Sequence, residues 1–220
     1  MVKKNLVYVP FIVLPLIITL ISLQYMPSII PTHYGISGQA DQWGSKYQIL
    51  ITPIITLVFC GIIIPILNWA NEKGKQQNKD NSKIINVTAI GMVALFNILT
   101  YVFIYTSYNK VANIGGDFVG KIPLIVVGLI FLLMGNYMPK AKSGMGVGIR
   151  TKSTRSDSEI WTKTQRLGGK CMVIFGLLYI PIAVMLPIYI VTPILVIGVF
   201  IASIYPTIYA KKLYKEKFGK

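Results

Sequence analysis

The sequence predicts an all-α integral membrane protein in which six transmembrane helices form a proline-kinked bundle with both termini in the cytoplasm. Hydrophobic residue types make up 54% of the 220 residues and charged types only 13%, whereas soluble domains carry about 25% charged residues. The mean hydropathy is accordingly high, at +0.62. Long apolar stretches almost free of ionisable side chains recur along the chain. The composition therefore excludes an ordinary soluble enzyme, a disordered tail and a disulfide-rich secreted domain.

Each apolar stretch has a length that suits helices across a bilayer, where one helix needs about 20 residues. The final stretch, 171–210, is 40 residues long and is interpreted as two helices joined by a tight turn. Helices are expected because hydrocarbon offers no water to satisfy backbone groups. The predicted spans are residues 5–25, 49–69, 84–107, 119–137, 170–187 and 190–210.

Lysine and arginine are concentrated in alternate gaps between the spans. Nineteen of the 22 lie before the first span, in the second and fourth gaps, or in the C-terminal tail. The other three are Lys46, Lys110 and Lys121. The positive-inside rule then places both termini and the second and fourth gaps in the cytoplasm. The net charge of +15 therefore reflects topology, and no direct nucleic-acid binding is expected.

The predicted membrane interior is poor in polar groups. Several spans contain proline, which removes a backbone donor and bends a helix, so it shapes the packing or provides a hinge. No ionisable side chain lies at the centre of a span, and Asn97 is the most polar central residue. We expect Asn97 to form an intramembrane polar contact with a neighbouring helix. A small transporter or channel for an unknown solute is the alternative function that these features leave open.

The sequence contains no recognisable arrangement of catalytic or metal-binding residues. It has no HExxH motif, no zinc-ligand spacing and no paired aspartates, and its one histidine, His33, lies in the first gap. Cys60 and Cys171 are expected to stay unpaired, because they lie at different predicted depths. We therefore expect no enzymatic activity, no metal and no cofactor.

The first gap, residues 26–46, is predicted to be an ordered cap on the outer side. Its early prolines favour extended backbone, and its later glycines permit turns. Trp43 suits the water–lipid boundary. His33 is interpreted either as a ligand-binding residue or as a structural hydrogen-bonding partner.

The fourth gap is long and strongly basic. Ser156 and Glu159 fit a capping box, so a helix is predicted to begin just after Ser156 and to continue into the fifth span. Gly144, Gly146 and Gly148 lack the preceding strand and the spacing of a nucleotide-binding loop, and are interpreted as giving backbone flexibility. The cations of this gap are expected to face anionic lipid head groups or, as a sharper hypothesis, an acidic cytoplasmic partner.

Two groups of residues resemble the signature of a known family. The first lies around the fourth gap and comprises Gly135-Asn136-Tyr137-Met138-Pro139-Lys140, Gly148-Ile149-Arg150-Thr151, Trp161 and Thr164-Gln165-Arg166. It resembles the SdpI family of bacterial six-span membrane proteins, named for immunity to a secreted sporulation-delay toxin. The second lies in the first gap and comprises Ile30-Pro31-Thr32-His33, Gly38, Trp43, Gly44 and Lys46. It resembles a domain of unknown function that often precedes the SdpI signature.

The resemblance implies a non-enzymatic binding protein in the bacterial cell membrane. Its implied partners are the lipid bilayer, a secreted peptide toxin against which it protects the cell, and a cytoplasmic transcriptional repressor that it sequesters for signalling. The candidate toxin-facing residues are Pro31, His33, Gly38, Trp43 and Gly44. The candidates for the cytoplasmic motif, in contact with a partner or lipid, are Asn136, Met138, Pro139, Gly148, Arg150, Thr151, Trp161 and Arg166.

The resemblance also suggests how the single membrane domain, residues 1–220, is organised. Residues 1–70 would form a helix pair with an ordered extracellular loop at 26–48. Residues 119–212 would form an SdpI-like unit with a basic cytoplasmic loop at 138–169.

Two features depart from the family pattern. Lys152-Ser153 stands where a Pro-Trp pair is common, and Gln165 stands where His or Asn is usual. Both departures lie in the cytoplasmic segment, so they bear on the repressor contact more than on the fold.

Overall fold

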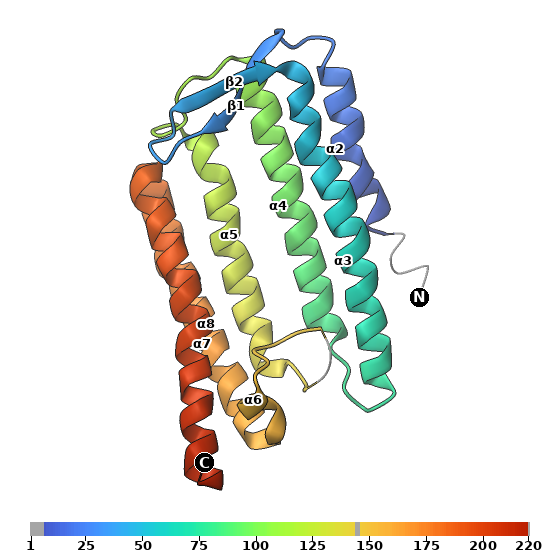
Figure 1. Ribbon diagram of the computed structural model, residues 1–220, viewed down its shortest axis with the longest axis vertical. Helices are drawn as coiled ribbons and strands as arrows, with labels where there is room; N and C mark the ends of the chain where they lie inside the picture. The colour runs from blue at the N-terminus through green and yellow to red at the C-terminus, as the bar shows by residue number, and fades with distance from the viewer. Residues whose placement is uncertain (1–6, 144–145, 220) are drawn as a thin grey trace. The chain divides into compact units, whose positions relative to one another are not determined.

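The computed structural model describes residues 7–143 and 146–219 and is mostly helical (Figure 1). The helices in these residues that are long and apolar enough to cross a membrane are α3 (Ile51–Lys75), α4 (Ser82–Tyr108), α5 (Phe118–Tyr137), α7 (Ser158–Met185) and α8 (Ile188–Phe218). These five helices confirm a helical membrane protein, whereas the count of six spans and the orientation of the termini stay predictions.

A sixth apolar helix, α2 (Val9–Ser22), is shorter than the predicted first span. It has 14 residues, or about 21 Å at 1.5 Å per residue, against about 30 Å of hydrocarbon. Residues 5 and 6, the first of the predicted span, lie outside the described residues.

Helix α7 begins just after Ser156, as predicted, and α8 extends beyond the apolar stretch that predicted it. The predicted capping box of Ser156 with Glu159 is wrong, because Ser156 ends the short helix α6 (Lys152–Ser156). The extended residue Asp157 caps α7 instead. Its carboxylate accepts the N–H groups of Glu159 and Ile160 at 2.9 and 3.0 Å, which satisfies donors that a helix start leaves open.

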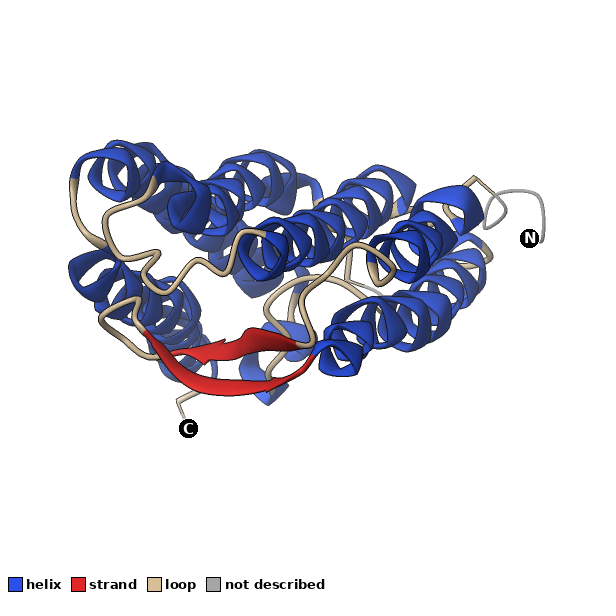
Figure 2. Ribbon diagram, turned by 90° about the horizontal axis from the view of Figure 1, so that it is seen from above, coloured by secondary structure: helices blue, strands red, loops and turns tan. Residues whose placement is uncertain are grey.

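The first gap contains a β-hairpin, which the predicted all-α class did not include. Strand β1 (Ile29–Tyr34) pairs antiparallel with β2 (Ala40–Ser45), and the two lie side by side in Figures 1 and 2. The β-branched and aromatic residues of β1 favour a strand. Gly38, with φ of +81°, supplies a turn conformation that glycine adopts readily. The class is therefore helical with one two-stranded sheet.

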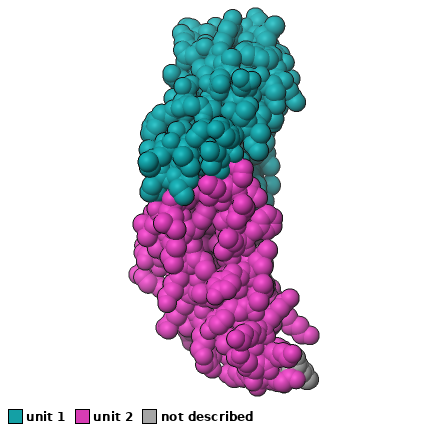
Figure 3. All heavy atoms as spheres, turned by 90° about the vertical axis from the view of Figure 1, so that its left-hand side faces the viewer, with its two compact units in different colours: residues 1–65, 89–127, 181–192 teal, residues 66–88, 128–180, 193–220 magenta. Residues whose placement is uncertain are grey.

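The chain divides into two compact units, which Figure 3 colours separately. Unit 1 comprises residues 1–65, 89–127 and 181–192, and unit 2 comprises residues 66–88, 128–180 and 193–220. Each of the five long helices contributes residues to both units. Unit 1 contains the first, third and fifth gaps, and unit 2 contains the second gap, the fourth gap and the C-terminal tail. Most lysines and arginines therefore belong to unit 2.

Within unit 2, α5 and α7 pack closely through two pairs of glycines. A Cβ atom on Gly169 would lie 2.6 Å from the carbonyl oxygen of Gly135, and one on Gly135 would lie 2.8 Å from the carbonyl oxygen of Gly169. A Cβ atom on Gly176 would likewise lie 2.8 Å from the carbonyl oxygen of Gly128. The pairs follow each other in antiparallel order along the two helices. Small residues here let the two backbones approach, as is common between helices in membranes.

Two of the three cations in the predicted outer gaps are bound to the C-terminal ends of helices. Lys46 Nζ donates to the carbonyl of Leu23, the C-cap of α2, at 2.7 Å. Lys121 is 8% exposed, and its Nζ donates to the carbonyl of Val184 in the last turn of α7 at 3.0 Å. Carbonyls at a helix C-terminus lack intrahelical donors and carry partial negative charge. These two lysines therefore have a local structural role.

Candidate functional site

The hairpin is joined to the loop between α4 and α5, residues 109–117, within unit 1. The N–H of Ala40 donates to the carbonyl of Ala112 at 2.8 Å. The N–H of Ile114 donates to the carbonyl of Gly38 at the same distance, 2.8 Å. The loop therefore pairs with the start of β2 much as a third strand would.

Close packing holds the hairpin turn against this loop. A Cβ atom on Gly38 would clash with the backbone of Gly115, and one on Gly115 would clash with the carbonyl of Ser37. The hydroxyl of Tyr34 donates to the carbonyl of Val111 at 2.8 Å. The first and third gaps thus form one packed cap.

His33 and Asp41 form a polar pair on the hairpin. His33 Nδ1 lies 2.6 Å from Asp41 Oδ1, and both side chains are about half exposed. The pair orients the imidazole so that its other nitrogen, Nε2, faces away from the carboxylate. The described part of the chain contains no group of three or more His, Cys, Asp or Glu side chains that could hold a metal ion.

An apolar pocket of about 470 Å³ lies between the hairpin and the ends of α4, α5 and α8. The hairpin contributes Thr32, His33, Tyr34, Gly35, Ile36 and Gly38. The helices and the third gap contribute Leu99, Val102, Phe103, Thr106, Ile114, Gly120, Pro123, Leu124, Ile188 and Thr192. All of these residues belong to unit 1. The volume falls in the range of small-ligand pockets, about 300–1,000 Å³.

A second pocket, of about 400 Å³, continues along β1. It shares Thr32, His33 and Phe103 with the first pocket and extends past Pro31 and Gln42. The two pockets lie next to each other along β1, so a partly extended ligand could enter both.

The five predicted outer residues do not all reach these pockets. His33 and Gly38 line the 470 Å³ pocket, and Pro31 lines the second. Trp43 pairs with Pro31 across the hairpin and is 46% exposed. Gly44 lies against the side chain of Gln48, for which it leaves room.

Sequence reasoning missed the contributions of the third gap and of the helix ends. The available signal was the Asn113-Ile114-Gly115-Gly116 segment, whose small residues permit close backbone approach. Nothing local indicates that Phe103 or Thr192 would face a pocket, because each lies in a continuous apolar stretch.

In unit 2, buried amide side chains hold the loop between α5 and α7. Asn81 forms reciprocal hydrogen bonds with the backbone of Lys142, donating at 3.0 Å and accepting at 2.8 Å. Gln165 does the same with the backbone of Ile149, at 3.0 and 2.9 Å. Each amide satisfies one N–H and one C=O, as a neighbouring strand would. The loop is therefore held at two points along its length.

Trp161 and Gly148 complete the packing of this loop. Trp161 is 3% exposed, and its Nε1 donates to the carbonyl of Ala141 at 2.7 Å. Gly148 has φ of +97°, and a Cβ atom there would lie 2.9 Å from the Trp161 ring. The glycines were predicted to give flexibility, but Gly146 and Gly148 adopt left-handed conformations that a folded loop requires. Gly144 lies outside the described residues.

The eight predicted cytoplasmic residues fall into two groups. Those that support the local fold are Met138, Pro139, Gly148, Thr151 and Trp161. Those that are exposed are Asn136, Arg150 and Arg166. The cations of the fourth gap are all exposed, namely Lys140, Lys142, Arg150, Lys152, Arg155, Lys163, Arg166 and Lys170. The gap is thus a folded segment with a cationic surface.

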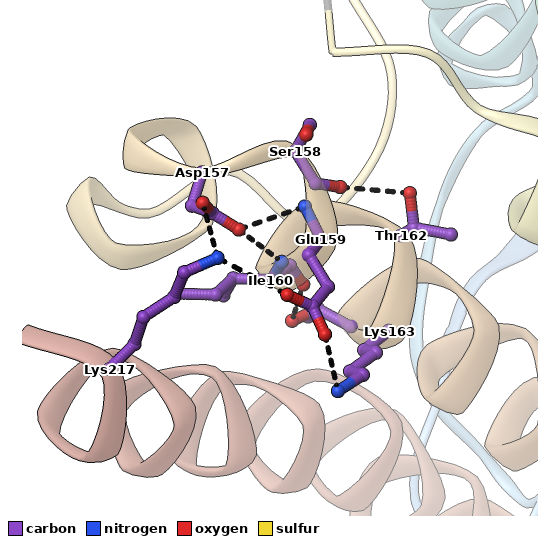
Figure 4. Close-up of polar contacts among 8 residues, drawn as sticks. Asp157, Ser158, Glu159, Ile160, Thr162, Lys163 and Lys217 are labelled. Carbon is purple, nitrogen blue, oxygen red and sulfur yellow. Dashed lines mark hydrogen bonds and ion pairs between the residues drawn. The ribbon is translucent and has the colours of Figure 1, made fainter.

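An ion-pair cluster joins the start of α7 to the end of α8 (Figure 4). Lys217 Nζ lies 2.8 Å from Asp157 Oδ2 and 3.2 Å from Glu159 Oε2, and Lys163 Nζ lies 2.8 Å from Glu159 Oε1. Hydrogen bonds from Lys217 and Lys163 lower the pKa values of Asp157 and Glu159, respectively. Because the cluster is exposed, it orients the two helix ends more than it stabilises them.

Asn97 joins α4 to α2 within unit 1. Its Nδ2 donates to the carbonyls of Phe11 and Val93 at 2.9 and 2.8 Å, and its Oδ1 accepts from the Tyr101 hydroxyl at 3.1 Å. The carbonyl of Phe11 lacks a helical donor because Pro15, four residues later, has no N–H. Both amide protons of Asn97 are therefore used within the protein, and the geometry assigns it a structural contact.

A known family matches the loop between α5 and α7, helix α7 and most of α8. Residues 140–210 match the SdpI/YfhL protein family. The SdpI/YfhL match thus contains all eight cations of the fourth gap. Residues 11–57 match a domain of unknown function, DUF1648, which covers most of α2, the hairpin and the start of α3.

A relative that aligns over the full length supports the same family. Immunity protein SdpI of Bacillus subtilis (strain 168) is 24% identical over 220 residues, which are 99% of this chain and 99% of that protein. No solved structure matches the chain significantly. The SdpI resemblance expected from the sequence is therefore confirmed. The protein is a multi-pass bacterial membrane protein.

Proposed function

We propose that the protein protects a bacterial cell by binding a secreted peptide toxin at the outer hairpin. The observation that carries this proposal is the apolar pocket of about 470 Å³ between the hairpin and the ends of α4, α5 and α8. A membrane-active peptide exposes apolar side chains, and burying them is favourable by about 25 cal/mol per Å². The pocket has room for a few side chains, so it suits an anchoring segment of the peptide. His33 and Asp41 offer polar groups beside it.

The proposal is tested by filling the pocket. Thr192 lines it from α8, and Thr192→Phe occupies volume that an apolar side chain of the peptide needs. The chain is expressed in a Bacillus strain that lacks its own immunity protein, and the sporulation-delay peptide is added. We expect the wild-type chain to raise survival, and Thr192→Phe to reduce survival toward that of cells without the protein.

The matched control places the same side chain elsewhere on α8. Ile197 is 57% exposed, so Ile197→Phe adds a ring without entering the pocket and should protect as well as the wild type. If the wild-type chain, present at normal levels in the membrane, leaves killing unchanged, the immunity proposal is refuted.

We further propose six spans with both termini in the cytoplasm, with α2 as the first span. Single cysteines test this topology in a chain that carries Cys60→Ala and Cys171→Ala. A membrane-impermeant maleimide should label Ile36→Cys, in the exposed hairpin turn, in intact cells. It should label Lys152→Cys only after the cells are permeabilised. If Lys152→Cys were labelled in intact cells and Ile36→Cys only after permeabilisation, the proposed orientation would be wrong.

We also propose that Arg150, Lys152 and Arg155 form a docking surface for an acidic cytoplasmic partner, in the role of the repressor that the family resemblance implies. All three are exposed, and none forms an ion pair with any described carboxylate. The amide contacts of Asn81 and Gln165 support this surface from within the loop.

Charge reversal at these three positions tests the docking surface. Toxin-dependent recovery of a DNA-binding repressor in the membrane fraction should be lost in the Glu variants, while survival against the toxin stays unchanged. Reversal of Lys211 and Lys212, in the C-terminal tail, should leave recovery unchanged. Equal recovery with all variants would exclude this surface as the repressor contact.

A further inference from the structure

Helix α7 carries one continuous exposed face within unit 2. The exposed residues recur every three or four positions and are Glu159, Lys163, Arg166, Lys170, Ile174 and Leu177. This spacing matches the helical period, so the residues lie along one face. A different face, about a quarter of a turn away around the helix, packs on α5 through Gly169 and Gly176. The exposed face is therefore free to contact a ligand.

The chemistry of this face changes between Lys170 and Ile174. Ile174 and Leu177 are each 58% exposed, and apolar side chains exposed on a membrane span contact lipid chains. Lys170 precedes Ile174 by about 6 Å along the helix axis, and Arg166 precedes it by about 12 Å. The head-group layer on each side of a bilayer is about 5–8 Å thick. Long cationic side chains at these positions reach that layer while their stems cover apolar surface.

Arg166 and Lys170 have no carboxylate partner among the described residues. Lys163, one turn away on the same face, is paired with Glu159 at 2.8 Å. The remaining acidic side chains of unit 2 contact other lysines or a serine, namely Glu72, Asp80, Asp157 and Glu216. The charge of Arg166 and Lys170 is therefore available to an anion from outside the chain.

We propose that Arg166 and Lys170 bind the phosphate of an anionic phospholipid. Their spacing of four residues places them one turn apart on the same face. The guanidinium offers a planar pair of donors to phosphate oxygens, and the ammonium adds a point charge. The apolar surface that begins at Ile174 lies alongside the acyl chains of the same lipid. A ligand with an anionic head and an apolar tail matches the whole face, whereas an acidic protein matches only its cationic part.

The full chain is reconstituted in nanodiscs of phosphatidylcholine, with and without phosphatidylglycerol. The test variant is Arg166→Gln with Lys170→Gln. The control is Lys163→Gln with Lys212→Gln, which removes two cations that have carboxylate partners. Phosphatidylglycerol should raise the Tm of the wild type and of the control, and should remain bound to both in native mass spectrometry. Its affinity should fall about thirtyfold in the test variant, which corresponds to about 1 kcal/mol for each cation.

Equal retention of phosphatidylglycerol by the test and control variants would overturn the proposal. If a polyglutamate peptide then bound the wild type but not the test variant, the face would be a protein contact. An equal rise in Tm with inorganic phosphate in place of the lipid would overturn the lipid assignment in favour of a site for free anions.

Discussion

The contact between α4 and α2 predicts an energetic coupling between Asn97 and Pro15. Asn97 Nδ2 donates to the carbonyl of Phe11 at 2.9 Å, and Pro15 leaves that carbonyl without a helical donor. Asn97→Leu keeps a side chain of similar size but removes the amide. In a Pro15→Ala chain the alanine N–H can supply the missing hydrogen bond, so the same substitution should cost less there.

The size of the coupling follows from which hydrogen bonds change. Asn97→Leu also removes contacts with Val93 and Tyr101, but these losses are the same with proline or alanine at position 15 and cancel. What remains is one unpaired carbonyl, that of Phe11. Leaving a buried polar group unpaired costs about 1–3 kcal/mol, and hydrogen bonds between membrane helices average about 0.6 kcal/mol with a maximum near 1.7. We therefore expect a coupling free energy of about 1 kcal/mol.

The four variants of this cycle are compared by their free energies of unfolding in mixed micelles, with SDS as denaturant and far-UV circular dichroism as the probe. Thr100→Val is the matched control on α4. The Thr100 hydroxyl donates to the carbonyl of Phe96 in its own helix at 2.9 Å, so this substitution should show no coupling to Pro15. An equal cost of Asn97→Leu in both backgrounds would refute the idea that Pro15 creates the need for the amide.

Three further outcomes are expected. Gly169→Val should lower the free energy of unfolding by about 1–3 kcal/mol, because its Cβ would lie 2.6 Å from the Gly135 carbonyl; a neutral effect on thermal unfolding would contradict the close packing of α5 and α7. Hydrogen bonds from a serine at the start of α4 lower the pKa of Asp80 from 3.8 to about 2, so its stabilising effect is complete above the ordinary pKa and is lost as the pH falls through 2. The Tm difference between wild type and Asp80→Asn should therefore be constant above about pH 5 and shrink below it; a difference that grows on acidification would argue against this assignment. Lys46→Met should lower the stability by about 0.3–1 kcal/mol because it uncaps α2, whereas Lys110→Met should leave the melting curve unchanged.

The long helices could be predicted from the sequence, and so could the start of α7 just after Ser156, but the C-terminal extension of α8 could not. Exclusion of apolar side chains from water is a property of each short segment, so α3, α4 and α5 follow directly from hydropathy. The extension of α8 brings Lys217 to Asp157 at the start of α7, and these residues are 60 positions apart. The local capping pattern of Ser156 and Glu159 gave no sign that Ser156 is the last residue of a separate short helix, α6.

The candidate sites were predicted only in part, for a similar reason. Loop residues around His33 stood out because a mixture of glycine, proline, tryptophan and histidine is unusual between apolar stretches. The pocket also requires Phe103 and Thr192, which look like any other residues of a membrane span. Near the start of α7, Trp161 was expected at a partner or lipid contact, yet it is buried and bonded to the backbone.

The sequence by itself determined the membrane class, the distribution of charge and the family resemblance, because hydropathy, charge and motif spacing are properties of single residues and short segments. Only the tertiary structure decided that the first gap is a hairpin, that Asn97 binds a carbonyl left without a helical donor by a proline, and that Gln165 binds the loop between α5 and α7. These features require hydrogen-bonding groups and pocket-lining residues from distant parts of the chain to come into contact. No local sequence pattern specifies which distant residues come into contact.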